Sequence, residues 1–350
     1  MKIAITADIH LRNGKNYTSR FNALVDVLRK LQEEDIKVLI IAGDCFDYEN
    51  SDFNLLEVAI DQSQILDLQV YLLPGNHDPF INQSMFSKSK IFVIEDTQLI
   101  EIGGINFLFV PYKDNNSMGS EVGKWSENIK DLKWVLVGHG DLLSNINVKS
   151  EYEKGIYMPL SIKDIELFQP NMVFLGHIHA QTSLNNIYYS GSPCGLDITE
   201  TGHRRFLVFD TFNFKVESHN ITTDYIYINE RILIYPTDKE EEYLKNKLDH
   251  IFFNFANSQE MKKIVRITLA GYSFDRNITE TYVKGYLEKD PNILFYELKI
   301  LDLLPANSDQ VRLSISERVL ENASNINFGN YSEIKELITQ EIMNLIFGRF

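Results

Sequence analysis

Five short apolar runs in this chain each end in a small turn that is followed by a residue able to bind a metal ion. Buried parallel strands are typically short apolar runs, and their carboxyl ends meet at one edge of a sheet. We therefore expect the polar residues that follow the runs to converge on one site. They are Asp8 and His10 after MKIAIT, Asp44 after VLIIAG, Asn76 and His77 after VYLLPG, His139 after WVLVG, and His177 and His179 after MVFLG.

The chain up to about residue 212 alternates between strand patterns and helix patterns. A helix that connects two strands returns the chain so that the strands run parallel. Two glycines between adjacent apolar runs predict a hairpin instead, so the sheet should be mixed. The predicted helices span 19–34 and 52–68, the hairpin spans 98–111, and the other strands span 37–42, 70–73, 134–137, 172–175, 188–193 and 205–210.

A second, smaller α+β domain is predicted over residues 213–325, where no further His–Asp cluster occurs. Residues 326–350 are predicted to form a C-terminal amphipathic helix, which either packs on its own domain, the default expectation, or contacts a partner. The strands of this part are expected at 225–234, 263–270 and 293–301, the helices at 238–256 and 278–289, and the apolar stripe of the last helix at Ile334, Leu337, Ile338, Leu345 and Ile346.

The net charge of −15, from 34 basic and 49 acidic residues, argues against a protein that simply coats DNA. It does not exclude a nuclease, because bound divalent cations supply local positive charge. No apolar run reaches the roughly 18 residues of a membrane span. Two candidate ligands lie in the first ten residues, so a cleaved leader is not expected and the protein should be cytoplasmic. Two cysteines make no disulfide framework.

The polar residues after the first two runs are suited to a metal centre. Asp8 and His10 lie two residues apart as the chain leaves a strand, so both can turn toward one point. Carboxylates and imidazoles suit Mn²⁺, Fe²⁺ or Zn²⁺. Asp44 follows a glycine, which lets the backbone approach closely, and its carboxylate can bridge two cations.

The later motifs extend this centre to two ions. Asn76 offers an amide oxygen, and His177 and His179 can divide between two ions. Two ions about 4 Å apart neutralise a phosphoryl group and activate a water molecule for in-line attack. His77 is not needed as a ligand, so it is available to protonate the leaving oxygen. A single histidine at a strand end is commonly structural, but five of the eight histidines fall in these motifs.

The ordered set DxH, GD, GNHD, GH and GHxH resembles the calcineurin-like metallophosphoesterases across residues 1–210. The resemblance implies a four-layer α/β/β/α sandwich, followed here by the smaller α+β capping domain. It also implies that His77 is the catalytic histidine. The implied ligands are Asp8, His10, Asp44 and His179 for one ion, and Asp44, Asn76, His139 and His177 for the other.

Within that superfamily the chain is similar to the SbcD-type DNA repair exonucleases through TADIHL, AGDCFD, LLPGNHD, FLGHIH and YYSGSP. This similarity implies an exonuclease and endonuclease that uses Mn²⁺ at DNA ends. It further implies an SMC-like ATPase partner, a role in double-strand-break processing and a capping domain that binds DNA. Because DNA binding is largely electrostatic, an acidic subunit would need a basic partner or a homodimer to build the DNA groove. Two positions depart from the group: Arg12 stands where glycine is common, and Asp47 stands where some relatives have histidine.

The alternative is a phosphodiesterase or phosphatase of the same fold that acts on small molecules or phosphoproteins. Protein phosphatases of the superfamily place arginines after GD and GNH to clamp a phosphate dianion. The corresponding stretches here, 47–49 and 78–80, contain no arginine, which favours a diesterase. A scaffold that has lost catalysis is disfavoured because no ligand position is missing.

DNA binding is not visible as a basic run or a known motif. Three lysines on segments between the ligand strands could touch phosphates, although a solvated surface position is the more common case for each. The chain has no nucleotide-binding loop, so any dependence on ATP must come from another polypeptide. The three lysines are Lys113, Lys124 and Lys149.

Overall fold

The computed structural model describes residues 1–47, 52–88, 90–143, 155–237, 239–253, 255, 261–326 and 332–347. The chain forms two compact units, a first unit of Met1–Leu196 with His203–Asp224 and a second unit of Asp197–Gly202 with Tyr225–Phe350. The boundary predicted at residue 212 therefore falls inside the first unit. The reason is β14 (Lys215–Asn220), which pairs along its length with β13 (Arg205–Asp210) and extends the first sheet.

The first sheet of the first unit has six strands in the order β14-β13-β1-β2-β3-β4. Strands β1 to β3 run parallel, as predicted from the helices that connect them. Strand β4, which was not predicted, is also parallel to β3, whereas β13 is antiparallel to β1. The parallel strands are β1 (Lys2–Thr6), β2 (Val38–Ala42), β3 (Gln69–Leu73) and β4 (Ile91–Val93).

The second sheet has the order β11-β12-β10-β7-β6-β5, and its β5–β6 pair is the predicted hairpin. Strands β6, β7, β10 and β12 are parallel, so this sheet is mixed, as expected. Its strands are β5 (Gln98–Ile102), β6 (Ile105–Val110), β7 (Trp134–His139), β10 (Met172–Gly176), β11 (Thr182–Leu184) and β12 (Ile187–Tyr189).

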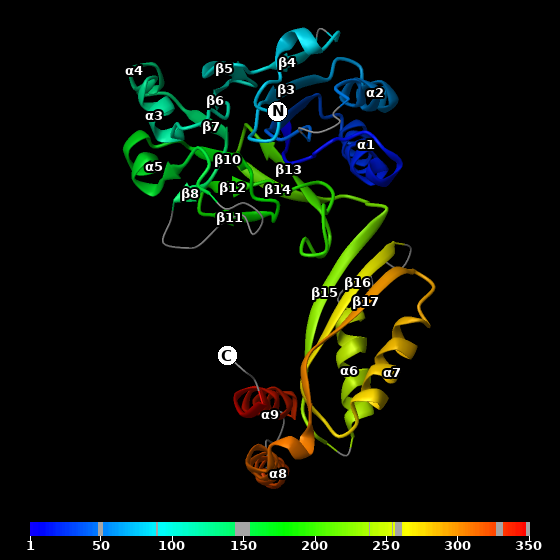
Figure 1. The fold of residues 1–350 in the computed structure, drawn as a ribbon. Coiled ribbons are helices and arrows are strands. Elements are labelled where there is room, and N and C mark those ends of the chain that lie inside the picture. Colours follow the sequence, from blue (N-terminus) through cyan, green and yellow to red (C-terminus); the bar gives the residue numbers. More distant parts are fainter. Residues whose placement is uncertain are drawn as a thin grey trace. The chain divides into compact units, whose positions relative to one another are not determined.

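The two sheets pack face to face and helices cover their outer faces (Figure 1). Alternation along β1 shows the layering, because Ile3 and Ile5 lie between the sheets while Ala4 faces the helices. The predicted α/β/β/α sandwich is thus confirmed. The covering helices are α1 (Thr18–Glu33) and α2 (Asn54–Ser63) on the first sheet, and α3 (Met118–Gly123), α4 (Ser126–Ile129) and α5 (Ile162–Phe168) on the second.

The second unit is built on a three-stranded parallel sheet with α6 and α7 on one face (Figure 1). The strands and helices predicted for this part are confirmed within a few residues. Helices α8 and α9 follow at the end of the chain. The elements are β15 (Tyr225–Ile234), α6 (Glu240–Phe253), β16 (Lys262–Ser273), α7 (Arg276–Leu287), β17 (Ile293–Pro305), α8 (Gln310–Asn325) and α9 (Ser332–Phe347).

Helix α9 packs on its own unit, the default expectation, through a face that shares Ile346 with the predicted stripe. Met343 and Phe347 are buried against Tyr272, with Ile346 beside them, because these residues share one helical face. Ile338 and Leu345 of the predicted stripe are 43% and 60% exposed. The side chains of Ile334 and Leu337 lie outside the described residues. Within the part of the chain that is described, no helix has the length and apolar character of a membrane span.

Candidate metal centre

All eight polar residues predicted from the strand ends lie close together in the first unit. The first sheet supplies those that follow β1, β2 and β3, and the second sheet supplies His139 at the end of β7 and the pair after β10. Three overlapping groups have potential ligand atoms within 4.8 Å of one another. They are Asp8, His10 and His179; His10, Asp44 and His77; and Asp8, Asp44 and His139.

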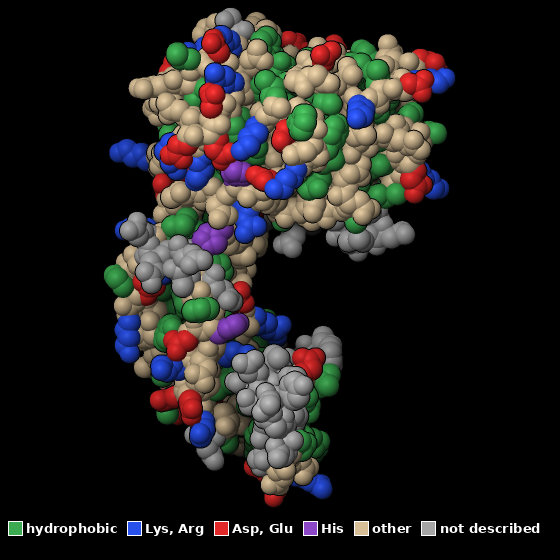
Figure 2. Space-filling view, turned by 180° about the vertical axis from the view of Figure 1, so that it is seen from behind, with side chains coloured by type: hydrophobic (Ala, Val, Ile, Leu, Met, Phe, Trp, Pro, Cys, Tyr) green, Lys and Arg blue, Asp and Glu red, His purple; other side chains and the backbone are tan. Residues whose placement is uncertain are grey.

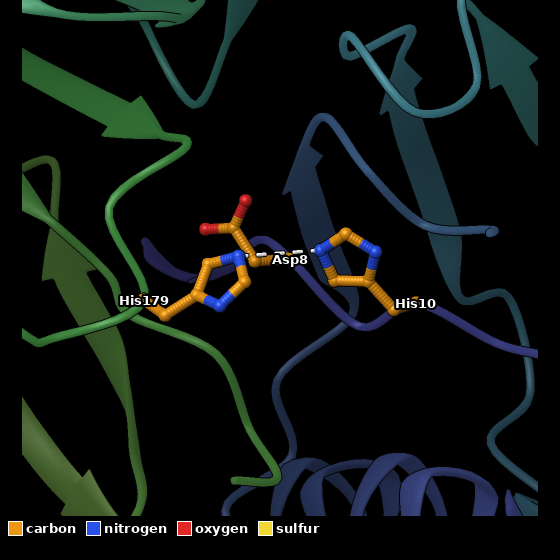
Figure 3. A group of neighbouring side chains, drawn as sticks. All are labelled: Asp8, His10 and His179. Atoms are coloured by element: carbon orange, nitrogen blue, oxygen red, sulfur yellow. Dashed lines mark hydrogen bonds between the residues drawn. The ribbon is translucent and has the colours of Figure 1, made fainter. Parts of the chain in front are cut away.

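The first group is formed by two facing imidazoles with a carboxylate beside them (Figure 3). The Nε2 atoms of His10 and His179 lie 3.3 Å apart. Two ligands about 2.1 Å from one ion, at angles between 90° and the tetrahedral value, lie about 3.0–3.4 Å apart. The separation of these nitrogens therefore fits two ligands of a single ion, with Asp8 as a third.

A further set of donors is formed by Asp44, Asn76, His139 and His177. The Nε2 atom of His139 lies 3.3 Å from Oδ2 of Asp44 and 2.8 Å from Oδ1 of Asn76. The same oxygen of Asn76 lies 3.2 Å from Nδ1 of His177. The 3.3 and 3.2 Å spacings again fit donors that share one ion, whereas the 2.8 Å spacing is that of a hydrogen bond between His139 and Asn76. Since Oδ2 of Asp44 is also 3.8 Å from Nε2 of His10, this carboxylate stands between the two groups.

The backbone at the candidate ligands is held in a conformation that most residues avoid. Asp8, His10 and Asp44 have φ near +50°, and His177 has φ of 97°. Such conformations cost about 1–3 kcal/mol each unless local contacts offset them, and they concentrate at functional sites. Gly75 shows how close the packing is, because a Cβ there would lie 2.1 Å from Oδ1 of Asp44.

A family model for calcineurin-like phosphoesterases matches residues 1–181, slightly more than half of the chain. The chain belongs to the calcineurin-like phosphoesterase family. This confirms the superfamily predicted from the motifs, and the chain is a metal-dependent hydrolase of phosphoester bonds.

Several solved structures resemble this phosphoesterase at low sequence identity. An archaeal phosphodiesterase is 14% identical over 63% of this chain and 99% of its own, with a TM-score of 0.35. A dimetal phosphatase from Danio rerio is 12% identical over 64% of this chain and 98% of its own, with a TM-score of 0.42. A Thermus thermophilus protein is 12% identical over 63% of this chain and 98% of its own, with a TM-score of 0.41.

The donor chemistry of the phosphoesterase centre suits divalent cations. Burial opposes ionisation of Asp44, but the charges of His139 and His10 outweigh it and hold the pKa of this carboxyl well below its usual range. Burial raises the pKa of Asp8 in the metal-free protein. Carboxylate, amide and imidazole donors together suit Mn²⁺, Fe²⁺ or Zn²⁺. When bound, two such ions neutralise the phosphoryl group and activate a water molecule.

Outer contacts orient the candidate ligands of the phosphoesterase. The Nδ1–H group of His139 donates to the carbonyl of Ala42 at 2.8 Å, which leaves Nε2 to face the centre. The Nε2 atom of His177 lies 3.7 Å from Oδ1 of Asp141, a buried carboxylate. The other ring nitrogen of His177, Nδ1, faces Asn76. Partners of this kind fix the tautomer and the ring plane of metal-binding histidines.

Arg204 holds the segment that carries His179. Its buried guanidinium donates to the carbonyl of His179, and its Nε–H donates to the carbonyl of Ser192 at 3.0 Å. The amide of Ser192 donates to the same His179 carbonyl at 3.0 Å. The sequence prediction missed Arg204 and Asp141, because nothing in their spacing distinguishes them from other charged residues.

His77 is oriented by Asp47. The Nδ1 atom of His77 and the Nδ1 atom of His10 each lie 3.5 Å from Oδ1 of Asp47. His77 is 36% exposed at its side chain, whereas His10 is almost fully buried. Since Nδ1 of His77 faces Asp47, its Nε2 atom is the one that can contact a bound substrate at the edge of the centre. The departure noted at position 47 thus supplies a carboxylate at the edge of the centre.

Two arginines approach the site from a segment that the sequence prediction did not consider. Arg20 donates to Oδ2 of Asp47 at 3.0 Å, and Arg12 has its Nη1 atom 3.8 Å from the same oxygen. The stretches after GD and GNH lack arginine, as predicted, but the 12–20 segment brings guanidinium groups to the same place. The absence of arginine from those two stretches therefore does not leave the surroundings of the site without guanidinium groups.

Asp78 links the loop after β2 to the loop after β3 by hydrogen bonds. It is buried, and it accepts the backbone N–H groups of Gly75 at 2.6 Å and Phe46 at 3.0 Å. Burial and the nearby charge of Asp44 raise the pKa of Asp78 to about 7 in the metal-free protein, even though both amide donors favour its ionised form.

The lysines considered for phosphate contact form ion pairs with acidic side chains where they are described. Lys113 lies 3.1 Å from Asp96, and Lys124 pairs with Glu121. Lys149 lies outside the described residues. These contacts favour the solvated-surface interpretation for Lys113 and Lys124.

Proposed function

We propose that this chain is a two-metal-dependent DNA nuclease that hydrolyses phosphodiester bonds at DNA ends, with exonuclease and endonuclease action. The observation that carries the proposal is the position of Asp44 near both His10 and His139 within overlapping donor groups, with partly exposed His77 beside them. This arrangement supports two ions that meet a phosphate and a histidine that protonates the leaving oxygen.

The DNA substrate rests on the similarity of the strand-end motifs to SbcD-type exonucleases and on the second unit that follows the catalytic one. Mn²⁺ is the proposed ion because the similarity to SbcD-type exonucleases implies it, and the mixed oxygen and imidazole donors suit it. The proposed setting is double-strand-break processing in the cytoplasm.

Charge supports the involvement of a partner. The chain carries a net charge of −15, and basic and acidic side chains are interspersed on the face seen in Figure 2. Because DNA binding is largely electrostatic, metal ions and a second polypeptide would supply the missing positive charge. We propose an SMC-like coiled-coil ATPase and a second copy of this chain as partners, with the exposed Ile338 and Leu345 of α9 facing the ATPase.

The proposal is tested by comparing three substrates after removal and replacement of metal. End-labelled linear duplex DNA, bis-p-nitrophenyl phosphate and p-nitrophenyl phosphate are incubated with Mn²⁺, Mg²⁺ or Zn²⁺. The proposal expects digestion of linear DNA from its ends with Mn²⁺ and faster hydrolysis of the diester than of the monoester. Turnover of the monoester alone, with DNA left intact under all metals, would reject the nuclease.

The partner is tested separately by capture on immobilised protein and identification of the bound chains. Leu345→Glu should reduce recovery of an SMC-like ATPase, because a charge replaces an apolar contact. Leu167→Glu, a comparably exposed leucine on α5 of the first unit, is the matched control. Equal recovery with both variants would remove α9 as the contact.

A phosphatase acting on small molecules or phosphoproteins is the second candidate. Arg12 and Arg20 favour it, because guanidinium groups beside a metal centre suit a terminal phosphate dianion. The three-substrate assay separates the two candidates through the ratio of monoester to diester turnover.

A further inference from the structure

We propose that β17 pairs edge to edge with β17 of a second copy of this chain, in the antiparallel direction and centred on Leu298. The proposed function names a second copy as a partner without giving its surface. This inference rests on that part of the proposal and supplies the surface. The three-stranded sheets of the two copies would join into one continuous sheet.

The outer edge of β17 is not paired with any strand in the part of the chain that is described. The sheet has the order β15-β16-β17, so β17 lies at one edge and pairs with β16 along its inner side (Figure 1). An edge strand presents a row of backbone N–H and C=O groups that can pair with another chain. The register with β16 is regular from Phe295 to Ile300 and shifts at both ends of this segment, which limits the length of the new pairing.

The exposed side chains of β17 include several large apolar ones. Leu294, Phe295 and Leu301 are 55%, 61% and 52% exposed. Strand β15, at the other edge of the sheet, is described over its whole length and has no exposed large apolar side chain. Neighbouring apolar side chains with this exposure are typical of a surface that another chain covers. They favour β17 over β15 as the edge that pairs.

The two faces of β17 differ because side chains alternate along a strand. One face packs with α6 and α7 in the core of the unit and carries Tyr296, Leu298 and Ile300. The opposite face carries, in chain order, Phe295, Glu297, Lys299 and Leu301. On that face the order along the strand is therefore apolar, acidic, basic, apolar.

This order is complementary to itself when two copies run antiparallel. With the Leu298 residues of the two copies opposite each other, Glu297 lies opposite Lys299 of the second copy. Phe295 then lies opposite Leu301 of the second copy, and a two-fold axis repeats both pairings. Opposite charges and apolar pairs directly across from one another stabilise an antiparallel pair. Centring the pairing on Glu297 or on Lys299 instead would set like charges opposite each other, so the charges select one register.

The charges on this face already have partners within one chain, and the dimer would extend that network. Glu297 lies 2.6 Å from Nε of Arg266 and 3.4 Å from Nζ of Lys299. Glu297 and Lys299 are nevertheless 38% and 46% exposed at their side chains, so a second copy can reach both. Each Lys299 would then bridge the Glu297 residues of the two copies.

Sedimentation equilibrium of the full chain measures the dissociation constant of the dimer. Lys299→Glu and Glu297→Lys should each raise this constant about tenfold or more, because like charges then face each other across the two strands. An equimolar mixture of the two variants should recover the wild-type constant, because each cross-strand pair in the mixed dimer joins opposite charges. Recovery in the mixture also shows that both variants are folded.

Lys284→Glu is the matched control, because it reverses a lysine on α7 that is 49% exposed and pairs with a glutamate of its own helix. It should dimerise as the wild type does. Mixed with Glu297→Lys, it should restore the dimer less fully than Lys299→Glu does, because only one of the two cross-strand charge pairs is then attractive. Equal effects of Lys284→Glu and Lys299→Glu would reduce the result to net charge and overturn the inference.

The remaining outcomes separate the surface from the wider proposal. A mixture of the two β17 variants that fails to recover the dimer would overturn the inference. A dimer that both variants leave intact would retain the second copy but reject β17 as its surface. A wild-type chain that is monomeric at every concentration tested would reject the second copy as well. The nuclease proposal is decided separately by the three-substrate assay.

Discussion

The Oδ1 atom of Asp47 lies 3.5 Å from the Nδ1 atom of His77. Burial opposes ionisation of Asp47, but hydrogen bonds to His10, His77 and Arg20 outweigh it and hold its pKa well below the usual range. Asp47 is therefore a carboxylate at neutral pH, and it orients the ring of His77.

Asp47→Asn should lower kcat about 10²-fold, because an amide cannot hold a protonated imidazole as a carboxylate does. KM should change little. Since Asp47 also faces His10, the metal content of the variant is measured alongside steady-state kinetics. Asp35→Asn, an exposed aspartate of the first unit paired with Lys37, is the control. A kcat within threefold of wild type would contradict the role of Asp47.

Asp44→Ala should lose both ions, whereas Asn76→Ala should lose one, because only Asp44 stands between the two donor groups. Elemental analysis after gel filtration measures the metal per chain. A free metal concentration of about 100 times the Kd stabilises the folded state by about 2.7 kcal/mol. The unfolding temperature of wild type should therefore rise with metal, and that of Asp44→Ala should not. Equal metal content in the two variants would argue against a shared carboxylate.

Metal binding should depend on pH through His139. Burial opposes protonation of this imidazole, but the charges of Asp44 and Asp8 outweigh it and raise its pKa to about 9 in the metal-free protein. Since a metal ligand must be unprotonated, binding releases this proton below pH 9. The apparent affinity should rise by up to about tenfold per pH unit from pH 7 and level off above about 9. Calorimetry in buffers of different ionisation heat measures the proton release, and a pH-independent affinity would contradict it.

Arg204→Met should weaken the ion held by Asp8, His10 and His179 about 10- to 100-fold, as expected when a contact that orients a ligand is lost. The ion held through Asn76 should bind as in wild type. Titration with Co²⁺, followed by its visible absorption, resolves the two sites. Arg204→Lys should recover part of the affinity, because one donor to the His179 carbonyl remains. Equal weakening at both sites would indicate a general loss of structure.

Much of the first unit could be predicted from the sequence, because buried strands and a Gly-Gly hairpin leave clear patterns. The residues at which helices and strands end were harder to predict. The helix predicted over 52–68 ends at Ser63, because Gln64 takes a left-handed conformation that terminates it. The strand predicted over 188–193 ends at Tyr189, since Gly191 has φ of 74° and lies against the backbone of His179.

The candidate ligands could be predicted because each lies at or within a few residues of the carboxyl end of a strand, and strand ends converge by topology. The residues that orient them could not. Arg204 and Arg20 reach the centre from segments whose position depends on tertiary packing, and no spacing in the sequence marks them. The unit boundary was set too early for a related reason: β14 is a polar edge strand with a weak pattern, KVESHN.

The candidate ligands come from both sheets of the sandwich. Asp8, His10 and Asp44 leave the first sheet, and His139, His177 and His179 leave the second. The ions would therefore add cross-links to the apolar packing and to the hydrogen bonds that already join the two layers at this edge, such as that from His139 to the carbonyl of Ala42. Bound metal should therefore slow the local separation of the two sheets at this edge. Backbone amides near the carboxyl ends of β2 and β10 would then exchange with solvent more slowly in the loaded protein than in the stripped one.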